Sequence, residues 1–192
     1  MALQFRPNLA KIVELLLYLA HQKPGADKYQ AVKFFYLADR EHINRYGRPI
    51  TSEIYYALPY GPVASKAKEL LEKDKWTMRD AGLSDLPFEV NKVERSGPDK
   101  SPLVVIGAPK REVNYELFSR SDLRVFDEIL KNFGSLDFDE LYKITHDHEA
   151  YKKAWAKRGR SKRGLMTYDD MIESAEKRAS VVSDIGPVAA YL

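Results

Sequence analysis

The chain has 192 residues and a formal net charge of +3, and its 44% hydrophobic and 31% charged residues are typical of a soluble globular protein. It contains no cysteine, which excludes a disulfide framework and a cysteine zinc site. No window approaches the roughly 20 apolar residues of a membrane span, and Lys11 and Glu14 interrupt the apolar N-terminal run. We therefore expect a cytoplasmic protein without a signal peptide.

The N-terminal part of the sequence predicts two helices. Asn8 can cap the first helix, which Pro24-Gly25 ends. Asp27, with Gln30 three residues later, can cap a second helix that ends at Gly47. The second helix is apolar nearly all round, so we expect it to lie at the centre of the fold.

A third helix and a β-hairpin are expected next. Gly61-Pro62 places a proline in the first turn of a helix, where its missing N–H costs nothing, and this helix runs to about Asp74. The segments "PFEVNKVE" and "PLVVIGAP" are rich in β-formers and flank "RSGPDKS". They predict an antiparallel hairpin with a loop longer than two residues.

The C-terminal half carries one helix-start pattern three times. Ser119, Asp137 and Thr167 are each followed, three residues later, by an acid that can complete a capping box. We therefore predict a mainly α protein of the α+β class, a compact bundle of about six helices with one small antiparallel hairpin. It forms a single domain over residues 1–178, followed by an apolar tail, residues 179–192, that docks loosely or is disordered.

Few residues suggest catalysis. Asp39 and His42 are one helical turn apart and could act as a base and its orienting group. The alternative is a buried Asp39 carboxylate that forms an ion pair with Arg40 or Arg48. The sequence holds no Ser-His-Asp arrangement, phosphate-binding glycine loop or metalloprotease helix, so we expect no enzyme and no cofactor.

Two nearby histidines raise the possibility of a metal site. On a helix, His146 and His148 would point about 200° apart and could not bind one ion from the same face. His148 lies on an apolar stripe, where a hydrogen-bonded, partly buried histidine is expected. We predict no metal site.

Residues 47–63, "GRPITSEIYYALPYGPV", combine three prolines, two glycines and three tyrosines; we call them the tyrosine segment. Tyrosine and arginine contribute strongly to protein interfaces, and prolines fix the backbone before a partner arrives. The segment therefore indicates a protein-recognition surface. The alternative is that its rings fill the core, although Tyr55 and Tyr56 cannot both face inward on an extended chain.

Residues 152–164, "KKAWAKRGRSKRG", hold seven basic residues and no acid; we call them the basic segment. Its cations alternate with Tyr151 and Trp155, a pattern typical of single-stranded nucleic-acid binding. A solvated helix end is the alternative. The residues available for anion or nucleic-acid contact are Lys152, Lys153, Lys157, Arg158, Arg160, Lys162 and Arg163.

Two blocks of sequence resemble the Panacea antitoxin domain, also called the SocA-like domain, which occurs in bacteria and phages. The first is "FYLADREHINRYGRPITSEIYYALPYGPVASKAKELL", and the second is "SRSDLRVFDEILKNFGSLDFDELYKITHDHEAYKKAW". The resemblance covers about residues 10–156. The chain departs from the family at four positions: Ser52 replaces a usual glycine, Ala64 a proline, Tyr151 a tryptophan and Ile144 a leucine.

The resemblance implies an antitoxin that neutralises a cognate toxin by direct binding. At least one relative is an adaptor that delivers its toxin to a Clp-type protease, so such a protease is a second expected partner. Carried over motif by motif, the expected partner-binding positions are Tyr36, Asp39, Arg40, Arg48, Tyr55, Tyr60 and Pro62. The C-terminal portion of the chain, including the basic segment, is where we expect partner-specific contacts. An autoregulatory nucleic-acid-binding protein that uses the basic segment is the alternative function.

Overall fold

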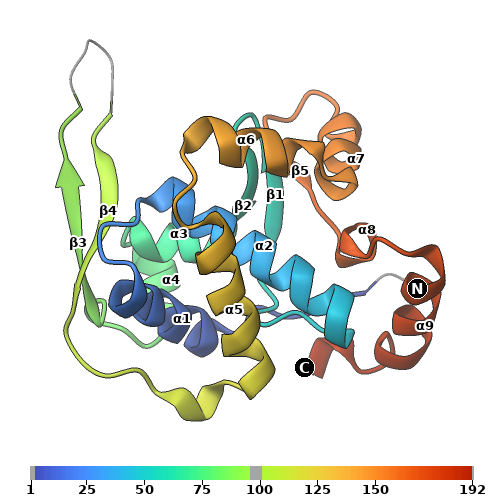
Figure 1. The fold of residues 1–192 in the computed structure, drawn as a ribbon, viewed down its shortest axis with the longest axis horizontal. Coiled ribbons are helices and arrows are strands. Elements are labelled where there is room, and N and C mark those ends of the chain that lie inside the picture. Colours follow the sequence, from blue (N-terminus) through green and yellow to red (C-terminus); the bar gives the residue numbers. More distant parts are fainter. Residues whose placement is uncertain (1–2, 96–100, 192) are drawn as a thin grey trace.

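The computed structural model describes residues 3–95 and 101–191 (Figure 1). In chain order these residues form α1 (Leu9–Gln22), α2 (Lys28–Tyr46), β1 (Tyr55–Leu58), β2 (Gly61–Ala64), α3 (Ser65–Leu71), α4 (Lys75–Asp80), β3 (Phe88–Val93), β4 (Leu103–Pro109), η1 (Tyr115–Leu117), α5 (Arg120–Phe133), α6 (Phe138–Asp147), α7 (Glu149–Lys157), β5 (Gly164–Leu165), α8 (Tyr168–Met171), α9 (Ala175–Ile185) and η2 (Ala189–Tyr191). The predicted class, mainly α with a small β component, is confirmed.

Helix α2 occupies the centre of the molecule, as its sequence predicts. The Asp27 carboxylate accepts a hydrogen bond from the Gln30 N–H, and Gln30 completes the capping box. Gly47 ends the helix in the left-handed conformation, with φ of +76°. Helices α3, α5, α6 and α8 contact α2, and so do β2 and β4.

The prediction that Pro62 lies in the first turn of a helix is wrong. Residues Gly61–Ala64 form β2, which pairs antiparallel with β1, and β1 also pairs with β5. Strand β2 lies at the edge of this three-stranded sheet, where a proline without an N–H is tolerated. Helix α3 begins only at Ser65, because the Glu53 carboxylate accepts hydrogen bonds from the Lys66 and Ala67 N–H groups and so caps it from a distance.

Helix α3 is also shorter than predicted. It ends at Leu71, and Asp74 caps a separate helix, α4, by accepting hydrogen bonds from the Trp76 and Thr77 N–H groups. A cap residue that begins a new helix explains why the predicted helix does not extend to residue 74.

The predicted hairpin of β3 and β4 is confirmed and projects from one side of the molecule (Figure 1). Phe88 and Ile106 are fully buried and anchor its base. The Ile106 N–H donates to the Ala26 carbonyl, which ties β4 to the segment before α2. Part of the loop "RSGPDKS" lies outside the described residues.

All three predicted helix starts in the C-terminal half are confirmed. Ser119 and Asp137 form full capping boxes for α5 and α6, and Thr167 accepts from the Asp170 N–H at the start of the single-turn α8. Helix α9 crosses the boundary predicted at residue 178, and Val181 and Ala189 beyond that boundary are buried.

Across the part of the chain that the structure describes, no helix combines the length and apolarity that crossing a membrane requires.

Candidate partner-binding surface

Asp39 fastens the tyrosine segment to α2. Its carboxylate is fully buried and accepts hydrogen bonds from the backbone N–H groups of Ile50 (2.8 Å) and Thr51 (2.9 Å). It also accepts from the hydroxyls of Thr51 (2.7 Å), Tyr55 (2.9 Å) and Tyr168 (3.1 Å). Five donors satisfy the buried charge and bring α2, β1 and α8 to one point.

The predicted ion pairs of Asp39 are wrong. Arg40 pairs with Glu173, and Arg48 pairs with Asp122 at 2.8 Å. His42 lies 2.7 Å from the Arg48 carbonyl and 3.1 Å from Asp122. Asp39 and His42 therefore have separate partners and do not form the acid–base pair considered from their spacing.

Asp122 forms a second buried polar centre, below the start of α5. It accepts from the Lys11 ammonium at 2.8 Å and from the Ser119 N–H at 3.1 Å, in addition to the contacts with Arg48 and His42. Burial acts to raise the pKa of Asp122, but hydrogen bonds from His42 and Lys11 and the charge of Arg48 hold that pKa well below its usual range. The carboxylate is thus charged and joins α1, α2 and α5.

The turn between β1 and β2 brings the two family-like blocks together. Gly61 has φ of +97°, and a Cβ there would lie 3.0 Å from the Thr145 Oγ1 and 3.1 Å from the His146 Cε1. The His146 Nε2 lies 3.1 Å from the Pro59 carbonyl oxygen, and the Tyr151 hydroxyl donates to the Leu58 carbonyl. Only glycine allows helix α6 to approach the turn this closely.

Lys33 lies beneath the same turn and was not singled out by the sequence analysis as a functional residue. It is fully buried, its ammonium donates to the Pro62 carbonyl at 2.7 Å, and it stands 4.7 Å from the Tyr29 ring centroid. Burial lowers the pKa of Lys33 to about 7. Among the described residues it has no carboxylate partner. The one signal in the sequence is that Lys33 is the single polar residue between Ala31 and Ala38.

The outer side of this turn carries exposed aromatic rings. Tyr60 is 64% exposed and Phe138 46%, and their centroids lie 6.0 Å apart. Phe138 also contacts Tyr29 (4.3 Å) and Tyr142 (6.1 Å), and Tyr142 stacks on His146 at 3.6 Å. We call these five side chains the aromatic cluster; α2, the β1–β2 turn and α6 supply them.

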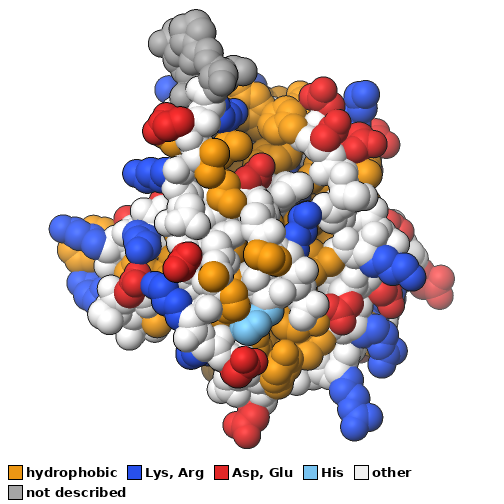
Figure 2. Space-filling model, turned by 60° about the vertical axis from the view of Figure 1, so that its left-hand side comes forward, with side chains coloured by type: hydrophobic (Ala, Val, Ile, Leu, Met, Phe, Trp, Pro, Cys, Tyr) orange, Lys and Arg blue, Asp and Glu red, His pale blue; other side chains and the backbone are white. Residues whose placement is uncertain are grey.

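A groove lies between the aromatic cluster and the β3–β4 hairpin. Tyr29, Tyr60 and Phe138 line one wall, and Arg95 and Leu103 line the other, around a volume of about 640 Å³. Figure 2 shows hydrophobic side chains gathered on this face beside the hairpin. The Tyr29 hydroxyl is buried without a hydrogen-bond partner among the described residues. We call this feature the aromatic groove.

The seven predicted partner-binding residues divide by exposure. Tyr36, Asp39, Tyr55 and Pro62 are buried, Arg40 and Arg48 are partly exposed, and Tyr60 is exposed. A side chain without exposed surface cannot touch a partner, so we assign the four buried residues to the support of the surface. The sequence analysis missed Phe138 and Tyr142, which a four-residue spacing on the predicted helix places on one face.

The basic segment lies in α7 and the loop before β5, away from the hairpin (Figure 1). Lys152 pairs with Asp147 and Lys153 with Asp170. Arg158 stacks on the Trp155 ring at 3.6 Å from its centroid, and Arg163 lies 4.4 Å from that of Tyr56. Lys157, Arg160 and Lys162 are exposed, and no ion pair involves them within the described residues.

His146, in the last turn of α6, and His148, directly after that helix, have different partners. The His148 Nδ1 lies 3.1 Å from the Tyr36 hydroxyl, and burial lowers the pKa of His148 to about 4. His146 faces the Pro59 carbonyl. Within residues 3–95 and 101–191, no three His, Asp or Glu side chains are grouped so that they could hold a metal ion.

Comparison with known proteins identifies the family. The family model described as "Antitoxin SocA-like, Panacea domain" matches residues 32–152, which is more than half of the chain and includes both the tyrosine segment and α6. Neither the curated proteins nor the solved structures contain a match. The chain therefore belongs to the SocA-like, Panacea-domain antitoxin family.

Proposed function

We propose that this protein neutralises a cognate protein toxin by binding it directly at the aromatic groove, without a catalytic step. The observation that carries the proposal is the contrast between the buried and exposed parts of the tyrosine segment. Asp39 and Tyr55 are buried and hydrogen-bonded, whereas Tyr60 at the turn is 64% exposed next to Phe138. Exposed aromatic rings on a rigid backbone are the usual centre of a protein interface.

The rigidity of this surface supports binding over turnover. The turn that presents Tyr60 is held by Lys33 from α2, by His146 from α6 and by Tyr151 from α7. A partner therefore meets aromatic side chains whose backbone is already ordered, which reduces the entropy lost on association. The buried carboxylates Asp39 and Glu53 accept several hydrogen bonds each and serve the fold.

The test is a pull-down of the tagged protein co-expressed with the product of its neighbouring gene, scored together with growth rescue. We expect the wild type to capture the toxin at high salt and to restore growth. Tyr60→Ala and Phe138→Ala should each weaken capture by about thirtyfold or more, because a central aromatic hot spot contributes about 2 kcal/mol or more. Trp76→Ala, which removes another exposed aromatic ring outside the groove, is the matched control.

Retained capture and rescue by both groove variants, at wild-type levels, would refute the groove as the binding site. The same cells also test delivery to a Clp-type protease. If the complex is an adaptor complex, the toxin level falls in cells with the protease and stays constant in cells without it.

Nucleic-acid binding through the basic segment is the second candidate function. The exposed cations Lys157, Arg160 and Lys162 favour it. Binding to phosphates releases counterions, so affinity for a single-stranded oligonucleotide would fall steeply between 50 and 200 mM salt. An aromatic protein interface would lose little over the same range. The salt dependence of the pull-down therefore separates the two functions.

A further inference from the structure

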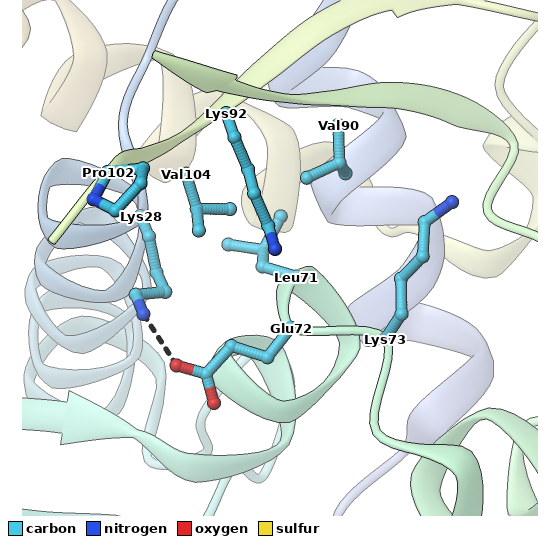
Figure 3. Close-up of a pocket in the computed structure, with 8 residues that line it drawn as sticks. All are labelled: Lys28, Leu71, Glu72, Lys73, Val90, Lys92, Pro102 and Val104. Carbon is cyan, nitrogen blue, oxygen red and sulfur yellow. Dashed lines mark hydrogen bonds and ion pairs between the residues drawn. The ribbon is translucent and has the colours of Figure 1, made fainter. Parts of the chain in front are cut away.

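A second groove lies between the β3–β4 hairpin and the end of α3 (Figure 3). Leu71, Val90 and Val104 supply its apolar surface, around a volume of about 630 Å³. Figure 3 shows the Lys92 ammonium next to Leu71, the Lys28 ammonium directed toward Glu72, and the Lys73 side chain at the edge of the groove. We call it the lysine groove.

The charge at the lysine groove is positive. Its one acidic side chain, Glu72, is already paired, because one carboxylate oxygen accepts from Lys28 and the other from Lys68 at 2.7 Å. Lys92 is exposed and forms no ion pair within the described residues. An incoming carboxylate would therefore find at least one lysine without a competing acid.

Lys73 is the second cation at the mouth, and its backbone is unusual. It has φ of +53°, directly after the last turn of α3, where glycine is the common residue. A non-glycine residue in this conformation costs roughly 1 kcal/mol. Its ammonium pairs with Asp85 at 2.8 Å, and Asp85 is shared with Lys110 at 2.7 Å. Because Lys73 and Lys110 share the single Asp85 carboxylate, these three side chains together carry net positive charge beside the groove.

The lysine groove and the aromatic groove are continuous. Lys28, Pro102 and Val104 line both of them. A protein bound over Tyr60 and Phe138 can therefore extend along the hairpin and also contact Lys73 and Lys92.

We propose that the lysine groove binds an acidic segment of the toxin, in which an apolar side chain enters between Leu71, Val90 and Val104 while flanking carboxylates pair with Lys73 and Lys92. This proposal rests on the proposed function, since it names the chemistry of that partner. The surface formed by Leu71, Val90 and Val104 favours an apolar side chain in the groove. The lysines around it favour carboxylates over cations in the bound segment. Together they select a short acidic and aliphatic segment.

The experiment uses the full-length protein and two probes. The first is a fluorescein-labelled peptide of alternating glutamate and leucine, measured by fluorescence polarisation against the same peptide with lysine in place of glutamate and against a ten-nucleotide oligothymidylate. The second is the neighbouring gene product in the pull-down. The variants are Lys73→Glu/Lys92→Glu and, as a matched control, the exposed Lys131→Glu on α5.

We expect the acidic peptide to bind more tightly than the basic peptide, and the double charge reversal to weaken it by about tenfold or more while Lys131→Glu leaves it unchanged. Equal binding of the two peptides, or acidic-peptide binding that the double variant does not weaken, would overturn the proposal. Tighter binding of the oligonucleotide would overturn it as well, in favour of a nucleic-acid site.

The two probes separate this proposal from the proposed function. If Tyr60→Ala abolishes toxin capture and Lys73→Glu/Lys92→Glu captures the toxin normally, the proposed function holds. Binding of an acidic toxin segment in the lysine groove is then refuted. If the wild type captures no neighbouring protein but the lysine groove binds the acidic peptide selectively, the proposed function fails while the groove's chemistry stands.

Discussion

Replacing Lys33 with methionine should stabilise this protein. The ordinary lysine pKa of 10.5 falls to about 7 in the fold because the side chain is fully buried. One pKa unit corresponds to about 1.4 kcal/mol, so burying this lysine lowers the free energy of unfolding by about 5 kcal/mol near pH 7. At that pH the lysine is charged in the unfolded chain, and folding must either desolvate the charge or release the proton. The variant also loses the hydrogen bond to the Pro62 carbonyl, which destabilises it by about 1–2 kcal/mol. We expect a net gain of about 3 kcal/mol at pH 7.

The pH dependence gives the sharper readout. Between pH 7 and 10.5 the unfolded chain holds a proton on Lys33 that the folded chain has released, so the free energy of unfolding rises with pH. Urea unfolding followed by circular dichroism at pH 7.5, 8.0 and 8.5 should show that the free energy of unfolding of the wild type rises by about 1 kcal/mol per pH unit relative to that of Lys33→Met. Lys33→Met should remove that slope, and the exposed-site control Lys131→Met should retain it.

An upper limit of pH 8.5 keeps tyrosine, whose ordinary pKa is about 10, almost fully protonated in the unfolded chain. Equal slopes in the wild type and Lys33→Met would show that Lys33 keeps its proton in the fold. The reasoning from burial would then be refuted, and the Pro62 carbonyl and the Tyr29 ring would have to stabilise the cation more than its desolvation costs.

Three further substitutions can be tested by urea unfolding, one at the left-handed backbone of Ser52 and two at the buried carboxylates of Asp39 and Asp122. Ser52→Gly should stabilise by about 1 kcal/mol, because Ser52 has φ of +57°, which glycine adopts without strain; an unchanged midpoint would contradict this. Asp39→Asn should cost about 3 kcal/mol, since an amide nitrogen cannot accept the three hydroxyl hydrogen bonds that meet at Oδ2; a loss below 1 kcal/mol would argue against the network. Asp122→Asn should cost about 2 kcal/mol at pH 7. Because the pKa of Asp122 is lowered from 3.8, its contribution is present above that pH and is lost as the pH falls, so the difference from the wild type should shrink below pH 4; a constant difference would refute it.

Local chemistry in the sequence was sufficient to place the starts of α2, α5 and α6. Asp27, Ser119 and Asp137 each carry the acceptor and the reciprocal side chain that satisfy the first N–H groups of a helix, and all three helices begin where these residues predict. The alternating β-formers around the hairpin loop were equally direct evidence. The family could also be recognised from the sequence, because the spacing of glycine, proline and tyrosine in the first family-like block is specific.

The structure gives a physical meaning to one departure from the family pattern. The backbone of Ser52 is left-handed, a conformation that favours the glycine implied at this position by the resemblance. The sequence alone showed that the residue differs, but not that its φ is positive.

Contacts between distant segments decided the rest. Glu53 caps α3 across more than ten residues and leaves Pro62 in an edge strand, which no local rule predicts. Asp39 has hydroxyl and backbone donors from two other elements instead of the arginines beside it, because the tyrosine segment folds back over α2. Burial is a property of the whole fold. The sequence therefore determined which residue types this surface has, and only the tertiary structure decided that Tyr60 and Phe138 are exposed while Tyr36 and Tyr55 are buried.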